Sequence, residues 1–158
     1  MSGSGAPTFS VTELNECRVA IIASSWHDVV MDGLIANALA TCEGAGCDVT
    51  VVRVPGSFEL GVAAMRAAKT GRYDAIVALG VIIRGGTPHF EYVSSAATQA
   101  LNQVALELGI PVGFGLLTCD DESQAIDRAG LPKSSENKGR EAAEAALVML
   151  GTLRSLGW

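Results

Sequence analysis

The stretch Tyr73-Asp-Ala-Ile-Val-Ala-Leu-Gly-Val-Ile-Ile83, followed at once by Arg84-Gly-Gly-Thr-Pro-His89, decides the fold. It is the longest apolar run in the chain and predicts a strand. Because its apolar residues follow one another without alternation, we expect both faces of this strand to be buried. Such burial is typical of a parallel sheet that is covered by helices on two faces.

The rest of the chain repeats this pattern on both sides of the central run. Three further apolar runs predict strands over residues 18–23, 48–54 and 111–117. Segments with helical spacing lie between and after them, at residues 28–42, 58–69, 90–108, 123–129 and 138–153. Strands that alternate with helices and are joined by right-handed crossovers predict an α/β fold. We expect a three-layer, flavodoxin-like sandwich with a four-stranded parallel sheet flanked by helices.

Length and composition set limits on the class of protein. The chain has 158 residues, which predicts a single domain over residues 17–158, preceded by a flexible arm of residues 1–16. Charged residues make up 18% of the chain, below the usual ~25%, so we expect an oligomer. The net charge of −6 argues against a nucleic-acid partner, which requires a basic face. No apolar run approaches a membrane span of ~20 residues, and the N-terminus lacks the basic and apolar parts of a secretory signal.

Four cysteines, at positions 17, 42, 47 and 119, show neither a CxxC pair nor a Cys/His spacing that suits zinc. We therefore expect no metal site. Cys42 and Cys47 are close enough in sequence to form a disulfide. The alternative, reduced cysteines in a cytoplasmic protein, is favoured for a chain of this size.

Unusual residues follow each predicted strand, at the edge where an open α/β sheet binds its ligands. These segments are Ser24-Ser-Trp-His27, Pro55-Gly-Ser-Phe-Glu59, Arg84-Gly-Gly-Thr-Pro-His89 and Thr118-Cys-Asp-Asp121. Polar, aromatic, glycine and histidine residues thus converge on one rim. This convergence predicts a ligand site there.

The third of these segments has two interpretations. Gly85 and Gly86 allow the backbone to approach a ligand, and free N–H groups at the following helix start would bind a phosphate. Alternatively, it is an ordinary turn in which Thr87 caps the helix and Pro88 occupies its first turn. The segment matches neither a P-loop nor a dinucleotide motif. His89 is a candidate for proton transfer near neutral pH, although it could also pack or cap.

Other polar and aromatic residues also have two interpretations. Trp26 could stack on a planar heterocycle or anchor the core or an interface. Glu59 could accept hydrogen bonds from a ligand or favour a helix dipole. His27 is more easily explained as a structural residue at a helix start. Arg128 and Lys138 could bind an anion or lie solvated on the surface.

Five blocks carry a resemblance to the lumazine synthase family over roughly residues 18–153. They are Val54-Pro-Gly-Ser-Phe-Glu-Leu60, Ala78-Leu-Gly-Val-Ile-Ile-Arg-Gly-Gly-Thr-Pro-His-Phe-Glu91, Gly115-Leu-Leu-Thr118, Gln124-Ala-Ile-Asp-Arg-Ala-Gly130 and Asn137-Lys-Gly139. The blocks keep the order and approximate spacing of the family, and the central block is highly specific.

This resemblance implies a transferase of riboflavin biosynthesis, at its penultimate step. The enzyme would condense 5-amino-6-(D-ribitylamino)uracil with 3,4-dihydroxy-2-butanone 4-phosphate. The products would be 6,7-dimethyl-8-ribityllumazine, phosphate and water. The resemblance implies no metal or organic cofactor.

The resemblance also assigns residues to parts of the site. Residues expected to contact the ring and its ribityl chain are Trp26, Ser57, Phe58, Glu59, Val81, Ile82 and Ile83. Residues expected to hold the phosphate are Gly86, Thr87 and Arg128. His89 would be the acid and base for imine formation and phosphate elimination. Phe114 and Lys138 would complete the pocket, with Phe114 and Arg128 reaching it across a subunit boundary.

The chain departs from the family at two places. Many members have phenylalanine and asparagine where this chain has Trp26-His27, and a tryptophan would still stack. The loop at residues 131–136 is longer than in members whose pentamers form sixty-subunit shells. We therefore expect a free homopentamer, with active sites at subunit interfaces and riboflavin synthase as a candidate partner.

Three other functions remain open from the sequence. An archaeal-type riboflavin synthase would share the fold but would not need a phosphate site at Thr87 and Arg128. A flavin or lumazine carrier would keep the pocket without His89, Arg128 and Lys138. A flavodoxin-like electron carrier would need a phosphate loop after the first strand, and Ser24-Ser-Trp-His27 fits one poorly.

Overall fold

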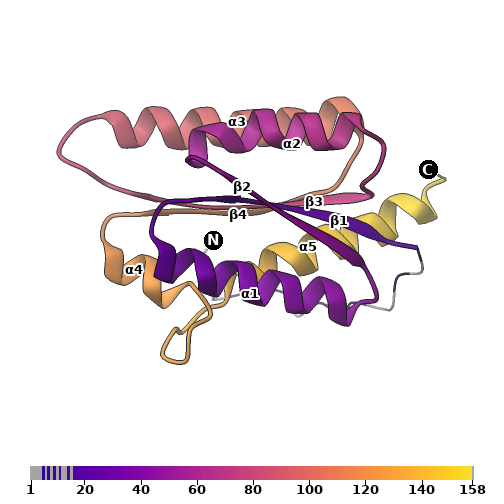
Figure 1. Cartoon of the computed structure of the whole chain (residues 1–158), viewed down its shortest axis with the longest axis horizontal. Helices are drawn as coiled ribbons and strands as arrows, with labels where there is room; N and C mark the ends of the chain where they lie inside the picture. Colours follow the sequence, from indigo (N-terminus) through magenta and orange to yellow (C-terminus); the bar gives the residue numbers. More distant parts are fainter. Residues whose placement is uncertain are drawn as a thin grey trace.

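A single parallel sheet runs through the middle of the molecule, with strands in the order β2-β1-β3-β4 (Figure 1). The strands are β1 (Arg18–Ser24), β2 (Asp48–Val54), β3 (Ala75–Ile83) and β4 (Val112–Cys119). The computed structural model describes residues 16–157 and, before them, positions 5, 7, 9, 11 and 14. The rest of the predicted arm lies outside the described residues.

Helices cover both faces of the sheet, which confirms the predicted three-layer α/β sandwich. One face carries α1 (Asp28–Gly44) and α5 (Lys138–Ser155), with the short α4 (Glu122–Asp127) beside α1 (Figure 1). The other face carries α2 (Leu60–Lys69) and α3 (His89–Leu108), and a 3₁₀ turn, η1 (Ser57–Glu59), leads into α2. None of the described helices is long and apolar enough to cross a membrane.

The two central strands are buried on both faces, as their uninterrupted apolar sequences predict. In β1, Ile21 packs into the core beneath α1 and α5, whereas Ile22 packs beneath α2 and α3. The edge strand β2 differs, because Val51 and Val52 are exposed in the single chain. An apolar run therefore identified the strand correctly but did not distinguish an edge position from a central one.

Several predicted boundaries were wrong by a few residues. Residues 57–59 form the 3₁₀ turn rather than the start of the second helix, so Glu59 precedes α2. The third strand begins at Ala75 rather than at residue 73. Asp74, just before it, is bonded to Arg18: its amide donates to the Arg18 carbonyl at 2.7 Å, and its carboxylate accepts from the Arg18 amide at 2.8 Å. Helix α3 begins at His89 with Pro88 as its N-cap and has no side-chain cap bond, so the alternative in which Thr87 caps this helix is wrong.

All four cysteines are buried and free. The alternative of a disulfide between Cys42 and Cys47 is therefore excluded. Burial raises the pKa of the Cys42 thiol to about 12, so this thiol is protonated and unreactive at neutral pH.

Glycines allow α5 to approach its neighbours closely. A Cβ at Gly139 in the first turn of α5 would lie 2.2 Å from the Leu34 carbonyl oxygen of α1. A Cβ at Gly113 of β4 would lie 2.2 Å from the carbonyl oxygen of Ala142 in α5. These contacts are with backbone atoms, which cannot move aside as a side chain can. They fix the start of α5, and hence the position of Lys138.

We expect Gly139→Ala to destabilise the fold by about 1–3 kcal/mol, the usual range for overpacking. Gly151, in the same helix, is the matched control, since a Cβ there meets no atom within 4 Å. Because alanine favours a helix, Gly151→Ala should stabilise by about 0.5–1 kcal/mol. Urea unfolding at equal chain concentration measures both changes. Equal midpoints for the two variants would contradict the close approach of α1 and α5.

Candidate active site

The segments that follow the four strands lie at one end of the sheet, because all four strands are parallel (Figure 1). This rim carries the predicted residues that follow β1, β2 and β3. Two hydrogen bonds join the ends of β1 and β2 at this rim. The Ser25 hydroxyl donates to the Val54 carbonyl at 2.8 Å, and Arg53 Nη2 donates to the Ser24 carbonyl at 2.9 Å.

Trp26 and Glu59 both lie beside Gly56. A Cβ at Gly56 would lie 3.1 Å from Glu59 Oε2 and 3.5 Å from Trp26 Nε1. A side chain at this position would therefore separate the indole from the carboxylate. Trp26 is 66% exposed and Phe58 61% exposed, so the aromatic surface is open to a ligand. An open indole beside a carboxylate suits a planar ring that carries hydroxyl groups.

Ser57 lies below this surface, against the end of β3. It is buried, and its hydroxyl donates to the Val81 carbonyl at 3.5 Å. A Cβ at Gly80 would lie 2.7 Å from Ser57 Oγ, so glycine is needed for this packing. Ile82 and Ile83 are half-buried at the strand end beside the rim. The structure thus places η1 directly over the end of β3.

The turn between β3 and α3 carries Gly86, Thr87 and His89, and all three are exposed. The sequence assigned no role to Arg84, which begins this turn. Its Nε donates to Asp120 Oδ1 at 2.8 Å, its Nη1 pairs with Glu91, and its guanidinium lies 4.1 Å above the Phe90 ring. Hydrogen bonds to Asp120 and Glu91 raise the pKa of Arg84. The hydrogen bond with Arg84 in turn lowers the pKa of Glu91.

Arg128 and Lys138, which periodicity could not place, are brought together by a closed loop. Their backbones join at 2.9 Å through the Lys138 amide and the Arg128 carbonyl, and Ala129 and Asn137 form an antiparallel bridge. Asn137 then caps α5 by accepting from the Arg140 amide at 3.0 Å.

Glu136 lies between the two cations. Its carboxylate is 2.5 Å from Lys138 Nζ and 3.7 Å from Arg128 Nη2. Burial alone would lower the pKa of Lys138, but hydrogen bonds to Glu136 and Glu141 outweigh it and raise the pKa. Lys138 is therefore charged at neutral pH. Glu136 contacts two of the predicted site residues. The sequence did not predict this, because no local pattern signals the contact of Glu136 with Arg128.

One predicted site residue, Phe114, does not reach the rim of its own chain. Phe114 pairs with Ala78, three positions before Leu117, which pairs with Val81. Three positions separate Phe114 from Leu117 by about 10 Å along the strand. Arg128 belongs to the loop cluster, and none of the hydrogen bonds or ion pairs among the described residues joins that cluster to Gly86, Thr87 or His89. Phe114 is half-exposed on the edge strand β4.

We expect the loop that carries Glu136 to loosen in acid. Asp127 holds this loop by accepting from the Ser135 hydroxyl at 2.6 Å and from its amide at 2.9 Å, and these bonds lower the pKa of Asp127 from 3.8. The pKa of Asp127 is lower in the folded protein than in the unfolded chain. Its stabilisation of the loop is therefore fully present above pH 3.8 and is lost as pH falls through the folded pKa. The rate of amide hydrogen exchange at residues 131–137, corrected for intrinsic rates, should rise as the pH falls through this range. Asp127→Asn should remove this pH step, and a step that persists in the variant would contradict the assignment.

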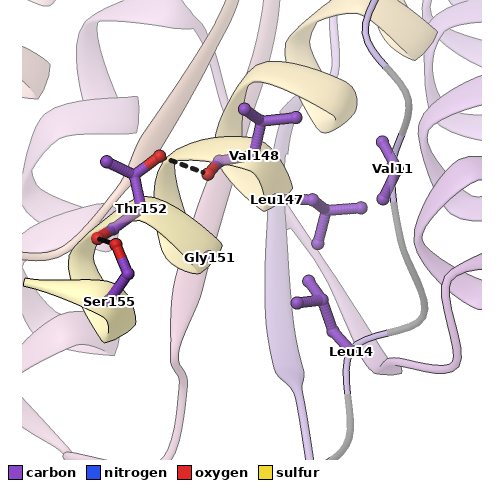
Figure 2. A pocket seen from close by; sticks show the side chains of 7 residues that line it. All are labelled: Val11, Leu14, Leu147, Val148, Gly151, Thr152 and Ser155. Carbon is purple, nitrogen blue, oxygen red and sulfur yellow. Dashed lines mark hydrogen bonds between the residues drawn. The ribbon is translucent and has the colours of Figure 1, made fainter.

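Two hollows of the single chain lie away from the rim. One, of about 360 Å³, lies between α5 and the residues before β1 (Figure 2). Its lining residues are Val11, Leu14, Leu147, Val148, Gly151, Thr152 and Ser155. The other is lined by Leu108, Gly109, Leu153, Leu156 and Gly157. The described residues contain no group of three His, Cys, Asp or Glu side chains placed to hold a metal.

A flavodoxin-like sandwich whose rim carries an indole, a carboxylate and an imidazole, with a pair of cations on a loop after β4, is typical of an α/β enzyme of small-molecule chemistry. The model of one family, 6,7-dimethyl-8-ribityllumazine synthase, matches residues 16–154. The chain belongs to this family, which confirms the resemblance found in the sequence.

Relatives named 6,7-dimethyl-8-ribityllumazine synthase match over nearly the whole chain. The protein from Streptomyces coelicolor is 60% identical over 157 residues, which cover 99% of this chain and 97% of the relative. The protein from Arthrobacter sp. is 57% identical over 160 residues, with 98% of each chain covered. The protein from Leifsonia xyli is 58% identical over 157 residues, with 99% of each chain covered.

Proposed function

We propose that this chain condenses 5-amino-6-(D-ribitylamino)uracil with 3,4-dihydroxy-2-butanone 4-phosphate to give 6,7-dimethyl-8-ribityllumazine, the penultimate step of riboflavin biosynthesis. The chain is an enzyme of the lumazine synthase family, a transferase. The structural observation that supports the proposal most directly is the position of Trp26 and Glu59 beside the same residue, Gly56. It offers a stacking face and a hydrogen-bond acceptor to the same ligand.

The first substrate binds at the segments after β1 and β2. The Trp26 indole stacks on the pyrimidine, and Glu59 accepts hydrogen bonds from the ribityl hydroxyls, with Ser57 and Phe58 along the chain. Backbone groups of Val81, Ile82 and Ile83 flank the ring. Trp26 and Glu59 both lie beside Gly56. Together they orient the ring amine of the substrate toward the segment after β3.

The second substrate binds by its phosphate. Gly86 and Thr87 offer backbone and hydroxyl donors, and Arg128 supplies charge, with Lys138 beside it. His89 transfers protons as the amine and ketone form an imine with loss of water, as phosphate leaves, and as the ribitylamino nitrogen closes the second ring with loss of a second water. Holding both substrates in register saves several kcal/mol of entropy. The chain's own residues supply these functions, and the proposal includes no cofactor or metal.

We also propose that the site is shared between neighbouring copies in a homopentamer. Phe114 and Arg128 then enter the site from the next subunit. The pairing of Phe114 with Ala78, well before the end of β3, supports this for Phe114. Apolar side chains exposed on η1, α2 and α3 support a subunit interface on this face: Phe58, Val62, Tyr92 and Leu106. A second subunit would cover both these residues and the open rim.

Sedimentation equilibrium tests the assembly. We expect the mass of five 16.3 kDa chains, because the long loop at residues 131–136 disfavours contacts between pentamers. A mass near sixty chains would contradict the free pentamer.

Residues 17–158 are proposed to act as one domain. The proposed location is the cytoplasm, where free cysteines persist. Co-sedimentation with riboflavin synthase tests the proposed partner.

The reaction itself is tested by mixing the purified protein with both substrates. Lumazine absorbance and phosphate release are followed together against a protein-free blank. We expect product above the blank that saturates in both substrates. Tight lumazine or riboflavin binding without acceleration would indicate a carrier instead.

A further inference from the structure

The β3–α3 turn, residues 84–88, has few contacts of its own with the rest of the chain. Its residues are exposed, and a Cβ placed at Gly85 or Gly86 would meet no atom within 4 Å. Helix α3 begins after this turn without a side-chain cap. Core packing therefore does not explain how this turn keeps a defined shape. The turn nevertheless carries Gly86 and Thr87 and leads into His89, which are predicted site residues.

Arg84 supplies contacts on three sides of this turn. Its amide donates to the Cys119 carbonyl at 2.9 Å, which extends the β3–β4 ladder. Its guanidinium bonds to Asp120, directly after β4, at 2.8 Å and pairs with Glu91 in the first turn of α3. It also lies 4.1 Å above the Phe90 ring. One side chain thus links both ends of the turn to the neighbouring strand.

We infer that Arg84 is a positioning residue, which holds the β3–α3 turn so that Gly86, Thr87 and His89 face the phosphorylated substrate. The inference rests on the proposed function. A planar guanidinium is suited to this role because it can bond two carboxylates and stack on an aromatic ring at once. A lysine can offer only a point charge at one of these places.

The alternative, that Arg84 itself binds the phosphate, predicts the opposite response to loss of its partners. Asp120 and Glu91 occupy the guanidinium donors. Removing one carboxylate would free the guanidinium for a phosphate ligand and lower the KM. If Arg84 positions the turn, the same change loosens the turn and raises the KM.

Steady-state kinetics on the full-length protein test this inference. We expect Arg84→Gln to raise the KM for the butanone phosphate about three- to tenfold, the range for a small network of exposed ion pairs. The KM for the ribitylaminouracil should not change, because Trp26 and Glu59 lie on other segments and pairing with β4 holds the backbone of residues 81–83. Arg84→Lys should recover part of the loss. Asp120→Asn should raise the same KM about two- to threefold, and the double variant should be no worse than Arg84→Gln.

Arg18→Gln is the matched control, since Arg18 forms an exposed ion pair with Asp74 at 3.5 Å at the opposite end of β1. It should leave both KM values unchanged. A lower KM in Asp120→Asn, equal shifts for both substrates, or an unchanged KM in Arg84→Gln would overturn the inference. If Arg84→Gln does not fold, Asp120→Asn alone decides by the direction of its shift. A wild-type protein without activity would instead refute the proposed function.

Discussion

His89→Ala is expected to lower the turnover rate by about 10²-fold without abolishing the reaction. Proton transfer by a positioned side chain contributes roughly 10²–10⁴-fold, and the lower end applies because an aromatic amine reacts with a reactive ketone even without catalysis. The substrates would still be held in register by the remaining residues. Initial rates of lumazine formation, corrected for the protein-free reaction, measure the effect.

The other histidine provides the control. His27 lies at the same rim but precedes α1 with a φ of 61°, a left-handed conformation that asparagine tolerates. His27→Asn should therefore retain turnover close to that of the unchanged protein. If His89→Ala also turns over at the unchanged rate, His89 has no part in the mechanism.

Arg128→Ala is expected to raise the KM for the butanone phosphate about 10- to 100-fold. A hydrogen bond to a charged group contributes about 1.5–3 kcal/mol, and the loss also leaves Glu136 paired with Lys138 alone. The KM for the ribitylaminouracil should stay constant, because that substrate carries no phosphate. Varying each substrate at a saturating level of the other separates the two values.

Arg140→Ala is the matched control for this variant. Arg140 lies two residues after Lys138 and forms an exposed pair with Glu144 at 3.6 Å, so its loss changes the net charge equally. Its KM values should match those of the unchanged protein. An unchanged KM in Arg128→Ala would show that the phosphate binds elsewhere.

Residue patterns alone predicted the strand and helix types and the three-layer class. This succeeded because burial on both faces requires an uninterrupted apolar run, as in Ala75–Ile83, and burial on one face of a helix requires a period of 3.6. The rim residues Trp26, Glu59 and His89 were also predictable. In a parallel sheet every strand ends at the same edge, so a residue placed after a strand is placed at the rim.

The resemblance supplied what patterns could not, namely the reaction and the roles of residues such as Ser57 and Phe114. Composition and periodicity describe burial, and burial does not specify which molecule a rim will bind. The matched family confirms the reaction class, while the individual roles remain predictions for the kinetic tests above.

The tertiary structure alone decided which distant residues meet. The pairing of Arg128 with Lys138 depends on closure of the loop between them, and the contact of Arg84 with Asp120 depends on β4 lying beside β3. The exposure of Val51 likewise follows from the edge position of β2. Local sequence patterns report the environment of each segment, whereas strand order and loop closure arise from contacts between segments far apart in the chain.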